Sequence, residues 1–330
     1  MNTIDLLAVG DITTDTFIRL KDAEVTCDID SANCKISMRW GDKIPYEFAA
    51  ELAGVGNAAN AAVSAARLGL HAGLLTWTGT DKDGDSNLQV LKKEGVDTTY
   101  VTQTPGIASN HDYVLWYTNE RSILIKHSTF PYKFPEDLVP PRYVYLSSLG
   151  DPSGETHKAI AAWISLHPES KLMFQPGQEI AMGKELLADV YAAAYLSACN
   201  KEEAEKILGY TSSQDISVLL TGMRELGPKI VLITDGLNGA YAYDGERMLR
   251  VPLYPDVRGP YERTGAGDAF ASSVACALTL GKPLDEALLW GPINSMSVVQ
   301  AIGAQEGLLT REQLEKYLAD APPEYALEII

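Results

Sequence analysis

A glycine-rich turn that opens a long apolar helix is the feature that most constrains this chain. Residues Glu262–Phe270 read ERTGAGDAF, and a run of small and apolar residues, ASSVACALTLG, follows directly. Gly265, Ala266 and Gly267 are small enough for the backbone to press against a ligand, and the run after them predicts a helix that begins there. The first amides of such a helix have no partners within it and lie at the positive end of its dipole, so they can bind an anion, most often phosphate.

Asp268 stands within this predicted anion site, where a carboxylate repels the bound group. The position is useful if Asp268 takes a proton from a hydroxyl that attacks the anion, which is the arrangement that phosphoryl transfer needs. The alternative is that Asp268 only caps the helix, the usual role of Asp at such a position. The spacing alone leaves both interpretations open.

Composition narrows the class of function before other motifs are considered. The chain has 330 residues, enough for one large domain or for a domain with a smaller companion. Its net charge is −17, and binding to a nucleic acid needs a basic surface, so we expect no nucleic-acid partner. A nucleotide would have to be bound locally, by backbone amides and Mg²⁺.

The cysteines and the N-terminus bear on the location of the protein. The four cysteines have no metal-type spacing and too low a density for a disulfide scaffold: Cys27, Cys34, Cys199 and Cys276. We interpret all four as reduced thiols. The N-terminus lacks the basic start of a signal peptide, and no apolar run approaches the length of a membrane span. The expectation is a cytoplasmic protein that does not bind a membrane.

The chain begins with a short apolar run, Ile4–Val9, which predicts a buried strand. Gly10 and Asp11 follow it, and Asp15 comes shortly after. In an open parallel sheet the ligand crevice lies beyond the carboxyl ends of the strands, so Asp15 is well placed to bind a polar substrate. A turn or cap carboxylate is the alternative interpretation of Asp15.

Two regions differ from the rest by their alternating polar and apolar residues. The first spans residues 21–48 and the second residues 98–130. This alternation predicts exposed antiparallel strands, with a hairpin in the second region that turns near Asn119 and Glu120. Two strand-rich insertions in an α/β chain are expected to form a small lid, which excludes water from a crevice and aligns the reactants.

A glycine turn and a small-residue helix lie between these regions. The helix is predicted over Asn57–Leu68, and Gly54, Gly56 and Ala59 match the dinucleotide fingerprint G-x-G-x-x-A. The match is weak, because the preceding IPYEFAAEL carries two glutamates and a proline, and the acids at the distance expected for a ribose contact lie in a loop. Asn60, in the first turns of this helix, is either tolerated on the surface or directed at a substrate.

The second half of the chain alternates predicted strands with amphipathic helices, the pattern of a parallel sheet covered on both faces. The predicted strands are Tyr143–Leu146, Lys171–Phe174, Ala194–Leu196 and Ile230–Ile233. Asn200 and Glu203 open the helix after the third strand, as an N-cap and its capping-box partner. A turn that leads into a further hairpin follows the fourth strand.

Five segments of the chain resemble, in their order and rough spacing, the ribokinase-like (PfkB) carbohydrate kinases, which also include nucleoside kinases: GDITTD, AGVGNAANAAVSAARLG, NKEE, ITDGLNGA and ERTGAGDAF. The resemblance covers nearly the whole chain, and TGAGD is its most specific part. It implies an α/β fold, a three-layer sandwich with a mainly parallel central sheet and a small β-sheet lid. The kinase core would comprise residues 1–17, 51–97 and 131–330, and the lid residues 18–50 and 98–130.

The resemblance also implies a role for each matching residue. Asp268 would be the catalytic base, and the anion hole would be formed by Gly265, Ala266 and Gly267. Substrate hydroxyls would be bound by Asp15, Gly56 and Asn60. The nucleotide would be bound by Asn200, Glu203, Thr234, Gly236, Gly239 and Asn294, with Glu203 helping to place Mg²⁺ through water.

The chain departs from the family pattern at three positions. The first acid of the family's D-x-T-G-A-G-D motif is Glu262 here, which leaves a K⁺ requirement open. Arg263 is bulkier than the usual residue and is directed either at a phosphate or at solvent. Val55 stands where relatives often have a glycine, a change that would reshape the substrate site. None of the three touches the expected base and anion hole.

The sequence therefore predicts an ATP-dependent kinase that uses Mg²⁺ and transfers the γ-phosphoryl group to a hydroxyl of a sugar such as ribose or fructose. A nucleoside is the alternative substrate, because FQPGQEIAMG resembles a nucleoside-kinase branch of the family and Tyr113, Trp116 and Tyr117 could stack on a base. The sugar is preferred because most of the family phosphorylates sugars. An NAD-dependent oxidoreductase and a catalytically silent binder are further alternatives, and the exposed lid edge could pair in a homodimer.

Overall fold

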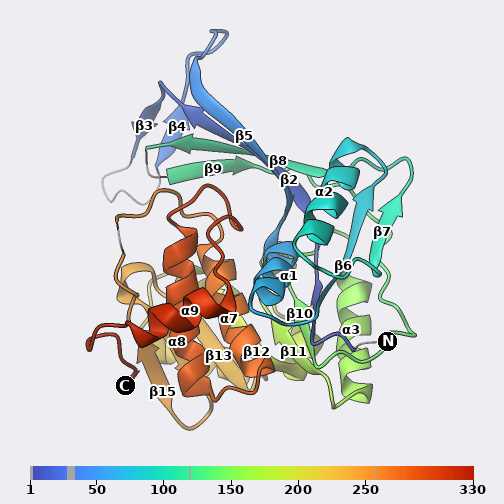
Figure 1. Ribbon diagram of the computed structural model, residues 1–330, viewed down its shortest axis with the longest axis vertical. Helices are drawn as coiled ribbons and strands as arrows, with labels where there is room; N and C mark the ends of the chain where they lie inside the picture. Colours follow the sequence, from blue (N-terminus) through green and yellow to red (C-terminus); the bar gives the residue numbers. More distant parts are fainter. Residues whose placement is uncertain (1–2, 28–33, 119, 257) are drawn as a thin grey trace.

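A ten-stranded sheet forms the centre of the computed structural model, which describes residues 3–27, 34–118, 120–256 and 258–330. In spatial order its strands are β16 (Glu328–Ile329), β15 (Met248–Val251), β14 (Ala240–Tyr243), β13 (Ile230–Thr234), β12 (Ala194–Asn200), β11 (Lys171–Phe174), β10 (Tyr143–Leu146), β1 (Leu6–Val9), β6 (Ala72–Gly79) and β7 (Val101–Thr104). The strands from β13 to β7 are parallel, and β14, β15 and β16 extend the sheet with antiparallel pairs (Figure 1).

The central parallel strands are buried on both faces, as their apolar sequences predict. In β1, Leu6 and Ala8 lie in the core on one face, and Leu7 and Val9 lie in the core on the other, because successive side chains of a strand alternate. Strands β10 and β11 have the predicted bounds. Strands β12 and β13 run beyond the predicted ends, so their last residues are the polar Asn200 and Thr234.

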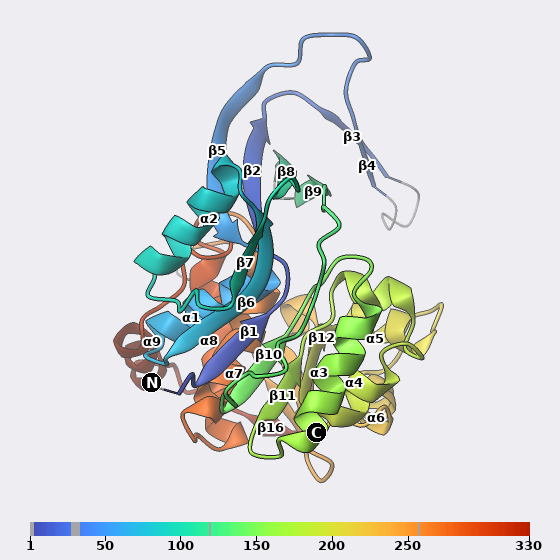
Figure 2. The ribbon, with the colours of Figure 1, turned by 90° about the vertical axis from the view of Figure 1, so that its right-hand side faces the viewer.

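Helices cover both faces of the sheet, and the three-layer α/β architecture is confirmed (Figure 2). One face carries α1 (Asn57–Arg67), α7 (Ala266–Thr279), α8 (Leu284–Val298) and α9 (Arg311–Ala319). The other face carries α3 (Gly154–Leu166), α4 (Ala188–Ala193), α5 (Lys201–Leu208) and α6 (Ile216–Glu225). The remaining helix, α2 (Lys82–Lys93), packs against a strand of the second sheet. Within the described part of the chain, no helix is long and apolar enough to cross a membrane.

A four-stranded sheet forms the predicted lid and projects from one end of the core (Figure 1). In spatial order its strands are β5 (Tyr46–Val55), β2 (Thr13–Leu20), β8 (Asn110–Tyr117) and β9 (Glu120–Leu124). Strands β8 and β9 form the predicted hairpin, with Tyr117 opposite Glu120, whereas Asn119 lies outside the described residues. A short pair, β3 (Glu24–Thr26) and β4 (Lys35–Ser37), extends the lid.

Strand pairing shifts the expected boundary between core and lid. Residues 13–17 and 51–55 were assigned to the core, but they belong to β2 and β5 and pair within the lid sheet. Residues 101–104 were assigned to the lid, but β7 pairs with β6 in the large sheet. The division of the chain into a core and a lid stays a proposal, and strands β2 and β5 run without a break across its expected boundaries.

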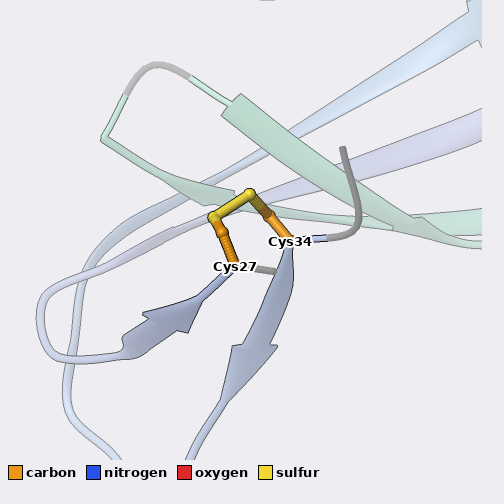
Figure 3. The surroundings of a disulfide bond; sticks show 2 residues. All are labelled: Cys27 and Cys34. Atoms are coloured by element: carbon orange, nitrogen blue, oxygen red, sulfur yellow. A yellow bond between two sulfur atoms is a disulfide. The ribbon is translucent and has the colours of Figure 1, made fainter. Parts of the chain in front are cut away.

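The interpretation of four reduced thiols is wrong for one pair. Cys27 and Cys34 form a disulfide at the ends of β3 and β4 (Figure 3). The antiparallel pairing of these strands sets Thr26 opposite Lys35, which brings the next residue on each strand together. Local spacing and cysteine density do not reveal such a cross-strand approach. Cys199 and Cys276 are free and buried, as expected.

Candidate active site

A cavity of about 380 Å³ lies between the lid sheet and the carboxyl ends of the parallel strands. Polar residues at or just after the ends of β1, β11, β12 and β13 line one side: Asp11, Gln175, Asn200 and Thr234. Residues of the lid line the other side, among them Asp15 and Asp112. The position is the one that an open parallel sheet offers for a ligand.

The predicted anion site is formed at the N-terminus of α7, and Gly265, Ala266 and Gly267 line the cavity. Gly265 adopts a φ of 80°, and a Cβ there would lie 2.5 Å from the Cα of Ala304. No side chain caps this helix. The Ala269 amide donates a hydrogen bond to the Gly265 carbonyl. The amides of Gly267 and Asp268, in contrast, have no backbone acceptor among the described residues. These amides can receive an anion.

Asp268 is buried beside these amides and is bound by three side-chain amides instead of capping its own helix. Its Oδ1 accepts hydrogen bonds from Asn57 Nδ2 at 2.9 Å and from Gln175 Nε2 at 2.9 Å. Its Oδ2 accepts one from Asn60 Nδ2 at 2.7 Å. Asn60 is therefore neither a surface residue nor solely a substrate contact, because its amide holds the carboxylate toward the cavity.

Burial raises the pKa of Asp268, and the hydrogen bonds from Asn60, Gln175 and Asn57 oppose that rise. The net effect is a carboxylate with a raised pKa, which accepts a proton more readily than an exposed aspartate does. The amide donors also fix its orientation. Asp268 thus has the environment of a general base.

The lid end of the cavity is lined by Asp11, Asp15, Asp112 and His127. Burial, together with repulsion from Asp112, raises the pKa of Asp15 to about 7. His127 lies between two carboxylates, with Nδ1 3.6 Å from Asp11 Oδ2 and Nε2 3.4 Å from Asp112 Oδ2. Burial lowers the pKa of His127, but the contacts with Asp11 and Asp112 outweigh burial and raise it to about 9. His127 is therefore a cation at neutral pH.

Asn200 and Glu203 line the opposite end of the cavity and form a capping box at the start of α5. The Glu203 amide donates to Asn200 Oδ1 at 2.8 Å, and the Asn200 amide donates to Glu203 Oε2 at 2.9 Å. The capping interpretation is confirmed, and it fixes both side chains at the rim of the cavity. Burial raises the pKa of Glu203, and its Oε1 remains available to a water or a cation.

Three of the residues expected to bind the nucleotide do not line this cavity. Gly236 is exposed, and Gly239 has a φ of 91° and packs against the backbone of Val251. Asn294 is fully buried, donates to Ser273 Oγ at 2.8 Å and accepts from the Leu309 amide at 2.9 Å. This geometry gives Asn294 a structural role, and its contact with adenine stays a prediction.

The region expected to govern a K⁺ requirement is occupied by protein groups. Glu262 Oε1 accepts from the amide and hydroxyl of Thr264 at 2.8 and 2.7 Å, and Oε2 accepts from the Gly303 amide. Arg121 of β9 places its Nε 3.7 Å from Glu262 Oε1 and also lines the cavity. Arg263 is half exposed at the rim and pairs with Glu120 at 3.5 Å.

Sequence reasoning missed several residues that line the cavity: Asn57, Gln175, Asp112, Arg121 and His127. A signal existed for Gln175, since it directly follows the parallel strand β11, just as Asp11 comes two residues after β1. The three lid residues carried no local signal, because only the folding of the lid over the core brings them to the cavity. The lid aromatics Tyr113, Trp116 and Tyr117 do not line it, and Trp116 is buried between Phe48 and Tyr261.

A buried carboxylate, helix amides that can receive an anion and a lid over one cavity fit a phosphotransferase that acts on an alcohol group. The model of the pfkB family of carbohydrate kinases matches residues 36–311, and the chain belongs to this family. It is 26% identical to a ribokinase of Bacillus subtilis over 276 residues, which cover 80% of this chain and 87% of that protein. It is 25% identical to a nucleoside kinase of Methanothermobacter thermautotrophicus over 280 residues, 80% and 84% of the two chains.

A solved structure shows the same fold. The ribokinase of Arabidopsis thaliana complexed with ribose and ATP superposes with a TM-score of 0.77 at 20% identity, over 96% of this chain and 99% of that one. The likeness confirms the ribokinase-like fold. Nothing in the comparisons supports the oxidoreductase alternative. The glycines that suggested it are explained by packing, because a Cβ at Gly54 would meet Val90 and a Cβ at Gly56 would lie 2.8 Å from the Asp11 carbonyl.

Proposed function

We propose that this protein is an ATP-dependent kinase that transfers the γ-phosphoryl group of ATP to a hydroxyl of a sugar. The observation that carries the proposal is Asp268, a buried carboxylate of raised pKa beside unpartnered helix amides in one cavity. Transfer of a phosphoryl group needs positioning and charge stabilisation more than covalent chemistry, and this arrangement supplies both.

The reaction begins when the lid encloses the acceptor and excludes water, which would otherwise compete as the nucleophile. Asp268 takes the proton of the acceptor hydroxyl as its oxygen attacks the γ-phosphorus in line with the leaving oxygen. The amides of Gly267 and Asp268 stabilise the charge on the transferring group. Asp15, Gly56 and Asn60 contact the acceptor, and Asn60 also keeps Asp268 oriented.

The nucleotide is expected at the end of the cavity lined by Asn200, Glu203 and Thr234. Among the described residues, no group of three acidic, histidine or cysteine side chains could hold a metal ion by itself. Glu203 offers one partly buried carboxylate, which suits Mg²⁺ that keeps most of its waters and arrives with the phosphates. When bound, Mg²⁺ would neutralise charge on the phosphates. K⁺ dependence, a cytoplasmic location and a homodimer through the lid stay proposals.

The shape of the acceptor end favours a sugar over a nucleoside. The lid aromatics that would stack on a base do not line the cavity, whereas Asp11, Asp15, Asp112 and Gln178 do. Carboxylate and amide oxygens accept hydrogen bonds from hydroxyls. A nucleoside remains the second candidate, since a relative of similar identity is a nucleoside kinase.

The proposal is tested by coupled measurement of ADP release with ATP and Mg²⁺ over a panel of pentoses, hexoses, sugar phosphates and nucleosides, with and without K⁺. Turnover of a sugar at the highest kcat/KM is the expected result. If a nucleoside were the best acceptor, the protein would be a nucleoside kinase, the second candidate. If no acceptor of the panel were turned over and ATP did not bind, the protein would instead be a catalytically silent ligand-binding protein.

The hydrogen bond from Gln175 predicts a change in the pH dependence of turnover. This bond lowers the pKa of Asp268, so its loss in Gln175→Met should raise that pKa further and move the acid limb of kcat to higher pH. Tyr145→Phe is the milder companion change, because it removes the hydrogen bond that the Tyr145 hydroxyl donates to Gln175 Oε1 and keeps the one from Gln175 to Asp268. The acid limb of kcat in Tyr145→Phe should also move to higher pH, but by less than in Gln175→Met. An unchanged pH profile in Gln175→Met would contradict the role of Gln175.

Acceptor binding should depend on the ionisation of Asp15. Its pKa of about 7 means that the carboxylate protonates as pH falls through 7 and then accepts fewer hydrogen bonds from hydroxyls. The dissociation constant of the acceptor, measured by calorimetry, should be about tenfold larger at pH 6 than at pH 8. His127, with a pKa of about 9, stays protonated over this range. Asp15→Asn should abolish the pH dependence, and persistence of that dependence would assign it to another group.

A further inference from the structure

Two carboxylates lie side by side on neighbouring strands of the lid sheet. They are at the end of the cavity lined by Asp11, Asp112 and His127, which we call the acceptor end. Asp15 of β2 and Asp112 of β8 are direct partners in the parallel pairing of these strands, and both line the cavity. Neighbouring strands lie about 4.8 Å apart, so the two side chains project side by side from one face. Like charges placed directly opposite destabilise a sheet. Because such a pair is largely withdrawn from water and destabilises the sheet, its presence indicates a role in function.

The His127 imidazolium contacts this pair through Asp112. His127 lies between Asp11 and Asp112 and is shared by both. Asp11 also accepts hydrogen bonds from the Tyr132 hydroxyl at 2.9 Å and from the Gly150 amide at 2.8 Å. Asp112 accepts one from the Lys126 amide at 2.9 Å. Asp15 has no side-chain hydrogen bond among the described residues, so its oxygens are free to accept from a ligand. At the acceptor end, three carboxylates surround one imidazolium.

Arg121 and Arg263, which line the cavity, lie beside the N-terminus of α7. Arg121 is opposite Trp116 in the β8–β9 pairing, four positions along β8 from Asp112, which corresponds to about 13 Å at 3.3 Å per residue. It lies against Glu262, beside the N-terminus of α7 where the transferring phosphoryl group is expected. Arg263 is in the same turn and pairs with Glu120. The cavity is therefore polarised, cationic where a phosphoryl group is received and anionic where the acceptor lies.

We infer that the acceptor carries no phosphate group before the reaction, and that Asp15 and Asp112 reject phosphorylated sugars while they bind the hydroxyls of an uncharged or cationic acceptor. The inference deepens the proposed function and rests on it. A phosphate at the acceptor end would meet carboxylates, and no arginine or lysine of the described residues lines the cavity there. Like-charge juxtaposition in a partly buried site excludes wrong ligands. Hydroxyl groups, in contrast, donate to carboxylate oxygens.

The class of acceptor is tested with the wild-type protein, ATP and Mg²⁺. The acceptors are ribose, fructose, adenosine, cytidine, fructose 6-phosphate and tagatose 6-phosphate, of which the last two retain a free hydroxyl at carbon 1. An unphosphorylated compound should have the highest kcat/KM, and that of fructose 6-phosphate should be at least about 100-fold lower than the best value. A phosphorylated sugar as the best acceptor would overturn the inference and leave the kinase assignment intact. Absence of turnover with every acceptor would overturn the kinase assignment, and the inference with it.

The residues are tested by a ratio that a general loss of structure does not change. The ratio compares the inhibition constant of fructose 6-phosphate with the KM of the best unphosphorylated acceptor. In Asp112→Asn it should fall at least about tenfold, because removing one carboxylate lessens repulsion of the phosphate. Glu47→Gln is the matched control: Glu47 is an exposed lid acid that pairs with Arg19 at 3.8 Å and lies outside the cavity lining, so the ratio should stay the same. Equal weakening of both ligands in Asp112→Asn would show that Asp112 only supports the lid.

Discussion

Asp268→Asn should reduce kcat by about 10²- to 10⁴-fold while ATP still binds with nearly its original affinity. The substitution removes the proton acceptor and keeps the size of the side chain. Asn57, Asn60 and Gln175 all donate to this position, and an asparagine oxygen can still accept from them. The measurements are kcat by coupled ADP release and the dissociation constant of ATP by calorimetry.

A loss of fold must be separated from a loss of the base in this experiment. In place of Oδ2 the asparagine nitrogen would face Asn60 Nδ2, and in place of Oδ1 it would face both Asn57 Nδ2 and Gln175 Nε2, so at least one hydrogen bond of the network is lost. A melting temperature within a few degrees of the wild type would show that the network has adjusted. Turnover close to the wild-type rate in a folded Asp268→Asn protein would show that another group takes the proton, and the mechanism proposed above would fail.

The parts of this site that were predictable from the sequence are those encoded locally. The turn at Gly265 and the helix that begins at Ala266 depend on consecutive residues, so ERTGAGDAF was sufficient to predict an anion site with Asp268 beside it. The capping box of Asn200 and Glu203 depends on two residues three positions apart, so it was predictable from the sequence as well. Strands β1, β10, β11, β12 and β13 were predicted because the sheet is buried on both faces there and their apolar runs are uninterrupted, whereas the partly exposed β7 was expected in the lid.

The parts that were missed depend on pairing between distant segments. Gln175 reaches Asp268 across 93 positions, and the Asp15–Asp112 pair exists only because β2 and β8 are neighbours in the lid. The disulfide of Cys27 and Cys34 has the same origin in the pairing of β3 with β4. Asn294 has contacts that its local sequence did not indicate, because it is buried and links α8 to Ser273 and Leu309, while its expected contact with adenine stays a prediction. Local patterns therefore identified the reaction better than the specificity.

The two glycines of the anion turn should respond differently to alanine, which separates the shape of the turn from the space for the ligand. Gly265→Ala should lower the free energy of unfolding by about 2–5 kcal/mol, because the residue has a φ of 80° and its Cβ would lie within 2.5 Å of Ala304. Turnover should fall with it, since the turn that presents the amides of α7 is displaced. Urea denaturation and ADP release measure the two effects.

Gly267→Ala is the matched change, and it should leave the fold intact while impairing the reaction. Gly267 is the second residue of α7. Apart from its chain neighbours and the backbone of its own helix, no atom of the described residues lies within 4 Å of the position that its Cβ would take. Alanine is a better helix former than glycine, so the free energy of unfolding should stay level or rise by up to about 1 kcal/mol. The new methyl group would project into the space that the phosphoryl group needs, and a displacement of about 1 Å there lowers kcat by about 10²-fold. If Gly267→Ala kept full turnover, the open space beside these amides would not be where the phosphoryl group binds, and the role assigned to the N-terminus of α7 would be contradicted.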